Sequence, residues 1–248
     1  PDDVSGSSVA ASRSVVANTT GTLVGDATTA AGFLALDGSG DYLAFGTDVT
    51  GLRGLTAMTI CAWVRVGDTG TIRRRIVEHD DNYYLWQENG KFCFTIHGPG
   101  GAYMVSATSP AVGTWQHVTA TWQLNQSAKL YVNGVSEATI NNPTVAMPNT
   151  AQHLSFGAQR DNKPTPTPTA YFKGDMDDVA IWDEALTPAQ VEALAGRVGG
   201  GYSGRATPLE LDAFIAARSA TRILRTAATV NGLLVSANNA PANVRLYW

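Results

Sequence analysis

Residues 114–123 read Thr114-Trp115-Gln116-His117-Val118-Thr119-Ala120-Thr121-Trp122-Gln123, with two sets of side chains in alternation. Successive side chains of a β-strand point to opposite faces of a sheet, so this stretch would place one set on each side. The less polar set is Val118, Ala120 and Trp122. The stretch therefore predicts a strand with one face against a core and a second, more polar face.

Segments of the same kind recur from residue 33 to residue 182. Short β-branched or aromatic runs are separated by turn residues at intervals of about ten, which is typical of an all-β domain. Asn89-Gly90 and Asn133-Gly134 each lie between two such runs, and Asn-Gly supplies the positive φ angles of a two-residue hairpin. The pattern predicts an all-β fold with two antiparallel sheets packed as a sandwich.

From about residue 187 to the C-terminus, the sequence no longer shows the repeated strand pattern. Thr187-Pro188-Ala189-Gln190 has the form of a capping box with proline at the first helical position, which predicts a short helix to about Leu194. Residues 197–206 are rich in glycine and predict a flexible linker. We therefore expect the sandwich to occupy residues 1–196.

A second capping box, Thr207-Pro208-Leu209-Glu210, predicts a helix to about Ala227. The apolar pieces of residues 231–248 are expected to add one or two strands. Residues 207–248 would then form an appendage of a helix and a terminal strand, and the Lys163–Thr169 segment, with three prolines, would be an extended surface loop.

Composition narrows the range of partners. The formal net charge is −4 and 44% of the residues are hydrophobic, without an apolar run of the roughly 20 residues that a membrane span needs. The one basic cluster, Arg73-Arg74-Arg75, is predicted to be a solvated loop. We expect neither a nucleic-acid partner nor membrane insertion.

Two features bear on the cellular compartment. Cys61 and Cys93 both lie in strand-like segments, and one disulfide or two buried thiols fit equally. Pro1 is the residue expected after removal of an initiator methionine, and no signal-peptide pattern follows. A whole chain made in the cytoplasm is the expectation, with a mature secreted product or a fragment as the alternative.

Five segments in order resemble the laminin-G-like and pentraxin-like jelly rolls of the concanavalin A type. The segments are Leu34–Leu43, Met58–Val64, Thr114–Thr119, Leu130–Gly134 and the most specific, Gly174-Asp175-Met176-Asp177-Asp178-Val179-Ala180-Ile181-Trp182-Asp183-Glu184-Ala185-Leu186-Thr187-Pro188. The resemblance covers about residues 20 to 195. It implies a jelly-roll sandwich, here followed by a short helical tail, and a binding domain.

The resemblance also implies two alternative calcium sites, because oxygen ligands from Asp, Asn and Gln suit this cation. The set that matches the pentraxin-like site is Asp81, Asn82, Gln159 and Asp161. The set that matches a structural site of the wider family is Asp37, Asp41, Asp177 and Asp178. Turn-forming Asp and Asn residues without a metal are the competing explanation for both sets.

Catalysis is not expected. Asp175 and Asp177 have the i, i+2 spacing of a glycosidase carboxylate pair, but the surrounding Glu-rich pattern of sandwich glucanases is absent. The four histidines show no zinc spacing, and no nucleophile elbow or phosphate-binding loop occurs. No catalytic residue is therefore named.

The sequence leads to two functional hypotheses. The first is an adhesion module that binds a glycan or another surface ligand through exposed aromatic rings beside calcium, with Tyr83, Tyr84, Trp86 and Tyr103 as candidates. The second is a structural virion-surface protein, such as a phage decoration or tail-associated protein, that assembles as a homo-oligomer or with capsid or tail proteins through its C-terminal tail. Either role places the protein outside cells or on a virion surface.

Overall fold

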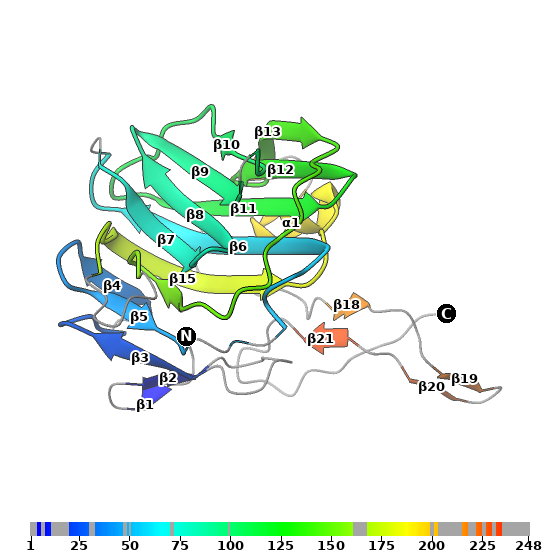
Figure 1. The fold of residues 1–248 in the computed structure, drawn as a ribbon, viewed down its shortest axis with the longest axis horizontal. Helices are drawn as coiled ribbons and strands as arrows, with labels where there is room; N and C mark the ends of the chain where they lie inside the picture. The colour runs from blue at the N-terminus through cyan, green and yellow to red at the C-terminus, as the bar shows by residue number, and fades with distance from the viewer. Residues whose placement is uncertain are drawn as a thin grey trace. The chain divides into compact units, whose positions relative to one another are not determined.

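The computed structural model describes residues 20–29, 33–46, 49, 51–69, 72–98, 100–160 and 168–198, together with short paired strands elsewhere. The chain divides into two compact units, Pro1–Gly204 and Arg205–Trp248. The first unit contains the two large sheets shown in Figure 1. Cys61 and Cys93 are buried free thiols on different sheets, so they do not form a disulfide.

Sheet A has nine antiparallel strands within the described residues. In spatial order they are β1 (Val4–Ser5), β2 (Ser8–Ala10), β3 (Thr20–Val24), β5 (Tyr42–Ala44), β14 (Leu154–Phe156), β7 (Arg74–His79), β8 (Tyr83–Glu88), β9 (Lys91–Ile96) and β10 (Met104–Val105).

Sheet B has six antiparallel strands in the same described part. Their order is β13 (Val135–Asn141), β12 (Ser127–Val132), β11 (Trp115–Gln123), β6 (Ala57–Val66), β15 (Lys173–Trp182) and β4 (Leu34–Asp37). The prediction of an all-β sandwich with two antiparallel sheets is confirmed. Among the described residues, no helix is long and apolar enough to cross a membrane.

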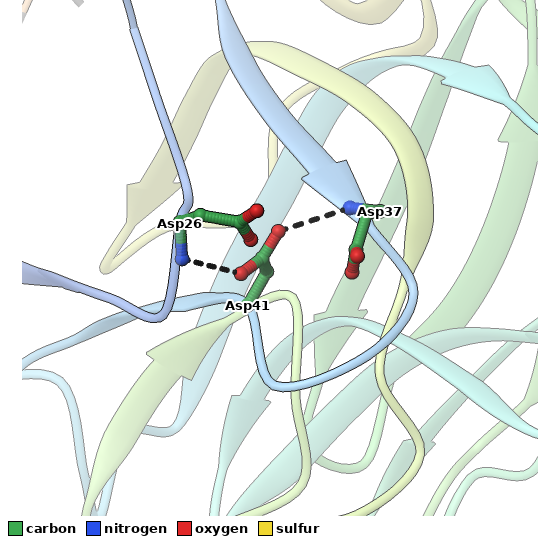
Figure 2. A group of neighbouring side chains, drawn as sticks. All are labelled: Asp26, Asp37 and Asp41. Atoms are coloured by element: carbon green, nitrogen blue, oxygen red, sulfur yellow. Dashed lines mark hydrogen bonds between the residues drawn. The ribbon is translucent and has the colours of Figure 1, made fainter.

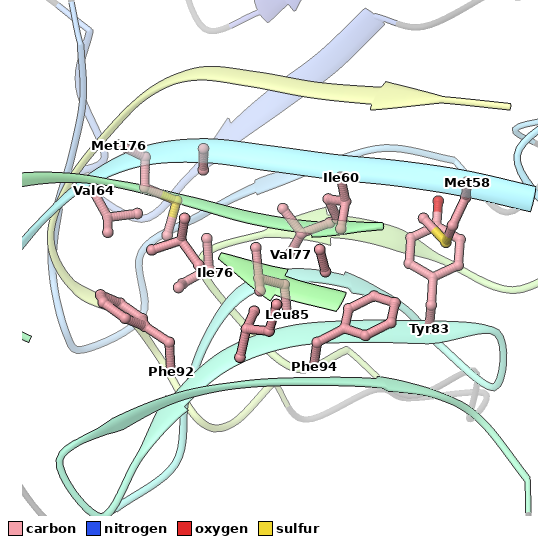
Figure 3. Close-up of a cluster of buried hydrophobic side chains, with 14 of the residues drawn as sticks. Met58, Ile60, Val64, Ile76, Val77, Tyr83, Leu85, Phe92, Phe94 and Met176 are labelled. Carbon is pink, nitrogen blue, oxygen red and sulfur yellow. The ribbon is translucent and has the colours of Figure 1, made fainter. Parts of the chain in front are cut away.

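The hydrophobic core fills the space between the two sheets. Met58, Ile60 and Val64 of β6 face Leu85 of β8 and Phe94 of β9, and all five are fully buried. Figure 3 shows these side chains interdigitating between the sheets. Burial of this apolar area supplies the main driving force for the fold.

Both Asn-Gly hairpins form as predicted. Asn89 and Gly90 have φ angles of 51° and 66°, and Glu88 pairs with Lys91 across the turn. Asn133 and Gly134 have φ angles of 49° and 75°. These left-handed conformations match the twist of the flanking strands, which explains why Asn-Gly fixes the register.

The predicted short helix is also confirmed. It is α1 (Pro188–Leu194), with Thr187 as N-cap and a complete capping box to Gln190. Val191 is its buried residue, and it packs with Leu186 against Tyr131 of sheet B. The helix therefore covers part of the outer face of sheet B.

The helix expected from residue 207 to about residue 227 is wrong wherever this segment is described. β18 (Ile215–Ala217) pairs with β21 (Gly232–Leu234), and β19 (Arg222–Leu224) pairs with β20 (Ala227–Thr229). The capping box, Thr207–Glu210, lies outside the described residues. A capping box marks where a helix can start, but an isolated helix needs tertiary packing, and hairpins satisfy the same backbone groups locally.

Within the predicted flexible linker, β16 (Arg197–Val198) pairs with β17 (Gly201–Tyr202), so these four residues form an antiparallel pair. The other linker residues lie outside the described part of the chain, as do 161–167 of the Pro-rich loop and the last residues, 235–248.

Candidate functional site

Three aspartates from neighbouring loops of sheets A and B come together. Asp26 follows β3, Asp37 ends β4 and Asp41 precedes β5. Ligand oxygens of the three carboxylates all lie within 4.8 Å of one another. Figure 2 shows the three side chains converging, with Asp41 between the other two.

Asp41 holds this arrangement together. Its side-chain oxygens accept hydrogen bonds from the backbone amides of Asp26, at 2.9 Å, and Asp37, at 3.1 Å. The residue is buried while Asp26 and Asp37 are exposed. Burial raises the pKa of the Asp41 carboxyl, although the backbone hydrogen bonds act in the opposite direction. Asp41 therefore connects two loops that are distant in sequence.

Gly25 permits the close approach of the Asp26 loop to Asp41. Gly25 has a φ angle of +77°, and a Cβ atom there would clash with the Asp41 carboxylate and lie 2.8 Å from the Gly40 carbonyl oxygen. Oxygens bound to one calcium ion at 2.3 to 2.6 Å can be separated by up to about 5 Å, so the three carboxylates fit a shared calcium ion.

The other members predicted for this set, Asp177 and Asp178, do not join it. Lys173 is the residue of β15 that pairs with Asp37, so Asp177 lies four residues further along the strand, roughly 13 Å away. Asp177 is buried opposite Trp63, and its Oδ1 accepts the Asp178 amide at 2.8 Å. A bulge between Asp177 and Ala180 gives Asp178 a φ angle of 47°. Asp177 and Asp178 therefore lie at a bulge of β15, apart from the other three aspartates.

In the pentraxin-like set, Asn82 is an internal connector. It is fully buried, and its Nδ2 donates to the carbonyl oxygens of Asp80, at 2.8 Å, and Thr150, at 3.0 Å. Asp81 has a φ angle of 53°, which places its side chain in a turn. The Asp81 carboxylate accepts a hydrogen bond from Gln152 Nε2 at 2.9 Å and lies 3.6 Å from His97 Nε2.

The remaining members of that set are placed differently. Gln159 is partly buried and forms a backbone bridge with Thr169. Asp161 lies outside the described residues. Of this set, the structure thus brings an exposed carboxylate, Asp81, next to a buried amide, Asn82, whose donor atoms are already bonded.

The four candidate aromatic residues separate onto two faces of sheet A. Tyr83 is fully buried in the core, so its prediction as a ligand contact is wrong. Trp86 is only 3% exposed, so the prediction of an exposed ring is wrong there as well. Adjacent residues of a strand face opposite sides, so Tyr84 and Trp86 share the outer face. Tyr103, just before β10, is 55% exposed. The sequence could not say which face of β8 was the inner one.

Tyr103 belongs to a preformed group of four side chains, which we call the outer platform: Arg73, Trp86, Glu88 and Tyr103. The Tyr103 and Trp86 ring centroids lie 5.8 Å apart with planes tilted by 34°. The guanidinium carbon of Arg73 lies 5.4 Å from the Trp86 ring centroid. Glu88 Oε2 accepts from both Trp86 Nε1 and Arg73 Nη2, each at 3.1 Å.

Cys93 of β9 lies next to the outer platform. Burial raises the pKa of its thiol to about 11. Cys93 pairs with Trp86 in the sheet register. The exposed Tyr103 ring is therefore held by its contact with Trp86, while more than half of its surface stays accessible.

Beneath this region lies a buried ion pair. Arg75 Nε lies 2.6 Å from Glu78 Oε2, and the two side chains are 4% and 0% exposed. The Arg75 guanidinium also stacks on Tyr84, at 4.4 Å, and Trp86, at 5.3 Å. Burial raises the pKa of Glu78 to about 7 against the opposing effect of Arg75, and burial lowers the pKa of Arg75.

The Arg73–Arg75 triplet is therefore not the solvated loop that the sequence predicted. Arg74 and Arg75 belong to β7 and are buried. Arg74 donates to both carboxylate oxygens of Asp68, at 2.9 and 2.6 Å. Burial of these charges is tolerated because each one meets a carboxylate.

The carboxylate pair weighed for catalysis is used structurally. Asp175 accepts from Arg65 Nε at 2.7 Å, and the Arg65 guanidinium lies 5.2 Å from the Phe33 and Trp115 ring centroids. Asp177 is 3% exposed and is held by the Asp178 amide. This geometry leaves no open carboxylate pair for glycoside hydrolysis at these two residues.

The comparisons with known proteins agree with this architecture. A laminin-G family model, described as the concanavalin A-like lectin/glucanases superfamily, matches residues 37–192. The chain belongs to this superfamily. Membership supports a ligand-binding module, and Asp175 and Asp177 of this concanavalin A-like chain are engaged in structural contacts.

Two curated relatives match parts of this concanavalin A-like chain. One is the rat sushi, von Willebrand factor type A, EGF and pentraxin domain-containing protein 1, 27% identical over 150 residues, 57% of this chain and 4% of the relative. The other is bovine adhesion G-protein coupled receptor D1, 29% identical over 83 residues, 34% of this chain and 8% of the relative. The chain thus spans less than a tenth of either relative.

Among solved structures, the type C botulinum neurotoxin shares the fold, with a TM-score of 0.54 and 14% identity. The match covers 71% of this chain and 46% of the neurotoxin chain. That neurotoxin depends upon interaction with two ganglioside molecules to enter cells. At this identity, the match shows the fold alone.

Two residues of these sites could not be found by motif. Asp26 follows Gly25, a turn signal, but its approach to Asp41 depends on the pairing of Val24 with Tyr42. Glu88 precedes an Asn-Gly turn and looked like an ordinary solvent-facing strand end. Its contact with Arg73 arises only when β7 and β8 pair.

Proposed function

We propose that this module binds a glycan on the outer face of sheet A, with the outer platform as its contact surface. The observation that carries the proposal is the Tyr103 ring, which is 55% exposed although it packs against Trp86. Sugar rings stack their apolar faces on such aromatic side chains, and a fixed ring loses little conformational entropy on binding.

The surroundings of Tyr103 suit a polyhydroxyl ligand. Arg73 has a 44% exposed side chain, and Glu88 is 23% exposed. Hydrogen-bond donors and acceptors therefore border the ring. Adhesion to a glycan-bearing surface outside cells follows as the proposed role.

We further propose that calcium binds at Asp26, Asp37 and Asp41. Calcium would neutralise three carboxylates that otherwise repel one another, and backbone carbonyls and water would complete its six to eight ligands. The cation would lock the loops that follow β3 and β4, and would thereby stabilise one end of both sheets.

Replacement of the exposed ring tests the glycan proposal. We expect Tyr103→Ala to lower affinity for a glycan identified by screening about tenfold or more, because a lost stacking contact is worth roughly 1.5 kcal/mol. Tyr103→Phe should retain most of the affinity because the ring remains. Titration calorimetry of the full chain would measure both.

The control is Val135→Ala, since Val135 is 45% exposed but lies on β13 of sheet B. Equal loss of affinity in Val135→Ala and Tyr103→Ala, or full affinity in Tyr103→Ala, would contradict a binding surface at the outer platform. Circular dichroism would show that each variant is folded.

Thermal unfolding with millimolar calcium and with EDTA tests the metal proposal. A native-state ligand at a hundred times its dissociation constant adds about 2.7 kcal/mol to the free energy of unfolding. We expect Asp26→Asn to abolish this calcium effect and Asp81→Asn to retain it. No effect in the unaltered chain, or the reverse result in the two variants, would rule out calcium at Asp26, Asp37 and Asp41.

Assembly through residues 207–248 on a virion surface is the alternative role. It predicts a homo-oligomer that becomes a monomer when the chain is truncated after Gly196, whereas the glycan-binding role predicts unchanged affinity. Light scattering of the full and truncated chains separates the two roles.

A further inference from the structure

The rim of the outer platform presents a donor and an acceptor side by side. Arg73 uses one of its N–H groups for Glu88, which leaves further N–H donors on a 44% exposed guanidinium. Glu88 Oε2 accepts from Arg73 and Trp86, and Glu88 makes no other side-chain hydrogen bond within the described part of the chain. Glu88 Oε1 thus remains available as an acceptor.

Glu88 keeps its negative charge. Burial raises its pKa, but the hydrogen bonds from Trp86 and Arg73 outweigh burial and hold the pKa below the usual range. A ligand carboxylate or sulfate beside Arg73 would therefore meet the ionised Glu88 at short range, and this repulsion would be only partly screened at the half-buried rim.

Glu88 is the carboxylate that compensates the positive charge of Arg73. Arg75 is already neutralised by Glu78. Lys91 is opposite Glu88 in the β8–β9 register, and its ammonium donates to the Ala107 carbonyl. Glu88 is thus the carboxylate paired with Arg73, and its removal would leave that cation uncompensated.

We infer that the outer platform selects a neutral glycan and that Glu88 is the residue that rejects acidic ones. One hydroxyl of the sugar accepts from Arg73 and the adjacent hydroxyl donates to Glu88 Oε1, while the ring face lies on Tyr103. A hydroxyl pair can satisfy both groups, whereas a carboxylate can satisfy only Arg73. This inference rests on the proposed glycan-binding function.

The test uses a panel of neutral gluco-, galacto- and manno-oligosaccharides, each paired with its counterpart oxidised to a carboxylate at C6. We expect the unaltered chain to bind the neutral member of a pair about tenfold more tightly. In Glu88→Gln, neutral affinity should fall severalfold and acidic affinity should rise, so that the preference is lost or inverted. Glu184→Gln, an exposed carboxylate change beyond sheet B, is the matched control.

The outcomes separate this inference from the proposed function. Tighter binding of the acidic members by the unaltered chain, or an unchanged preference in Glu88→Gln, overturns the role of Glu88. If that binding is still abolished by Tyr103→Ala, the glycan site at the outer platform stands without it. Binding of no member, neutral or acidic, contradicts both.

Discussion

The two faces of β7 and β8 are both buried, but different interactions bury them. On the inner face, Val77 and Leu85 are fully buried among apolar neighbours of the core. On the outer face, Arg75 and Glu78 are buried to the same degree by an ion pair and by aromatic rings. The inner face therefore depends on area removed from water, and the outer face depends on mutual neutralisation of charge.

A bulge allows one strand to serve both faces. The register shifts between Arg75 and Val77, so Ile76 and Val77 are both buried in the core cluster while Arg75 still faces Trp86. Bulges redirect side chains in this way next to functional surfaces. The outer face of β7 and β8 is thus as tightly organised as the core, although its residues are polar.

The largest effect is expected from Arg75→Met at pH 8. The substitution leaves the buried Glu78 carboxylate without its cation, which should cost about 3 to 5 kcal/mol of the free energy of unfolding. Leu85→Ala on the inner face should cost a similar amount, about 2 to 5 kcal/mol, by creating a cavity. Urea denaturation measures both.

A double substitution distinguishes the two mechanisms. Arg75→Met with Glu78→Met removes both charges and should restore stability to near that of the unaltered chain, because a buried ion pair contributes little net energy. If the double variant is as unstable as Arg75→Met, the outer face depends on the specific pair and the comparison fails.

The same pair predicts a pH effect. The folded-state pKa of Glu78 is raised to about 7 from an unfolded value of 4.5, so its contribution to stability is lost as pH rises through this window. The double Met variant lacks this loss. Its free energy of unfolding, relative to the unaltered chain, should therefore increase between pH 4.5 and 7, by roughly 2 to 3 kcal/mol, and stay constant above it.

Two buried histidines also make the stability depend on pH. Their effect cancels when the free energy of unfolding of the double Met variant is compared with that of the unaltered chain. Burial lowers the pKa of His79 to about 4 and that of His117 to about 3, so both destabilise the fold as pH falls below 6.5. Both chains share these histidines. A difference that stays flat from pH 4.5 to 7 would show that Glu78 is ionised throughout.

The sequence predicted the fold well because the fold depends on local patterns. Alternation in residues 114–123 became β11, and both Asn-Gly turns and the Thr187–Gln190 capping box formed as expected. Each of these features is specified by neighbouring residues alone. Where the segment after the second capping box is described, strands replace the predicted helix, because a helix also needs a partner surface, which the sequence does not display.

The candidate sites were predicted only in part because they depend on register. Asp37 and Asp41 are four residues apart and their proximity followed from one loop, whereas Asp26 joins them through strand pairing. Asp177 was assigned to the same site but lies too far along β15. A slip of one residue exchanges the faces of a strand, which is why Tyr83 could not be separated from Tyr84 by sequence.

Tyr83 and Tyr84 provide the smallest but most direct test of the comparison. The Tyr84 hydroxyl accepts the Asp81 amide at 2.9 Å and hydrogen-bonds to His97 Nδ1 at 2.9 Å, so Tyr84→Phe should cost about 1 kcal/mol. The Tyr83 hydroxyl is buried and has no hydrogen-bond partner in the described part of the chain. Tyr83→Phe should therefore leave the free energy of unfolding unchanged or raise it by up to about 1 kcal/mol, since a buried polar group without a partner is removed.

In urea denaturation, Tyr84→Phe should thus lower the free energy of unfolding, whereas Tyr83→Phe should leave it unchanged or raise it. The direction of the change in stability follows from the face of the strand. On the outer face Tyr84 loses the hydrogen bonds of its hydroxyl, whereas on the inner face Tyr83 loses a buried hydroxyl that has no partner in the described part of the chain. Destabilisation of both variants by the same amount would mean that the Tyr83 hydroxyl has a partner and that the two faces of β8 are less distinct than their packing indicates.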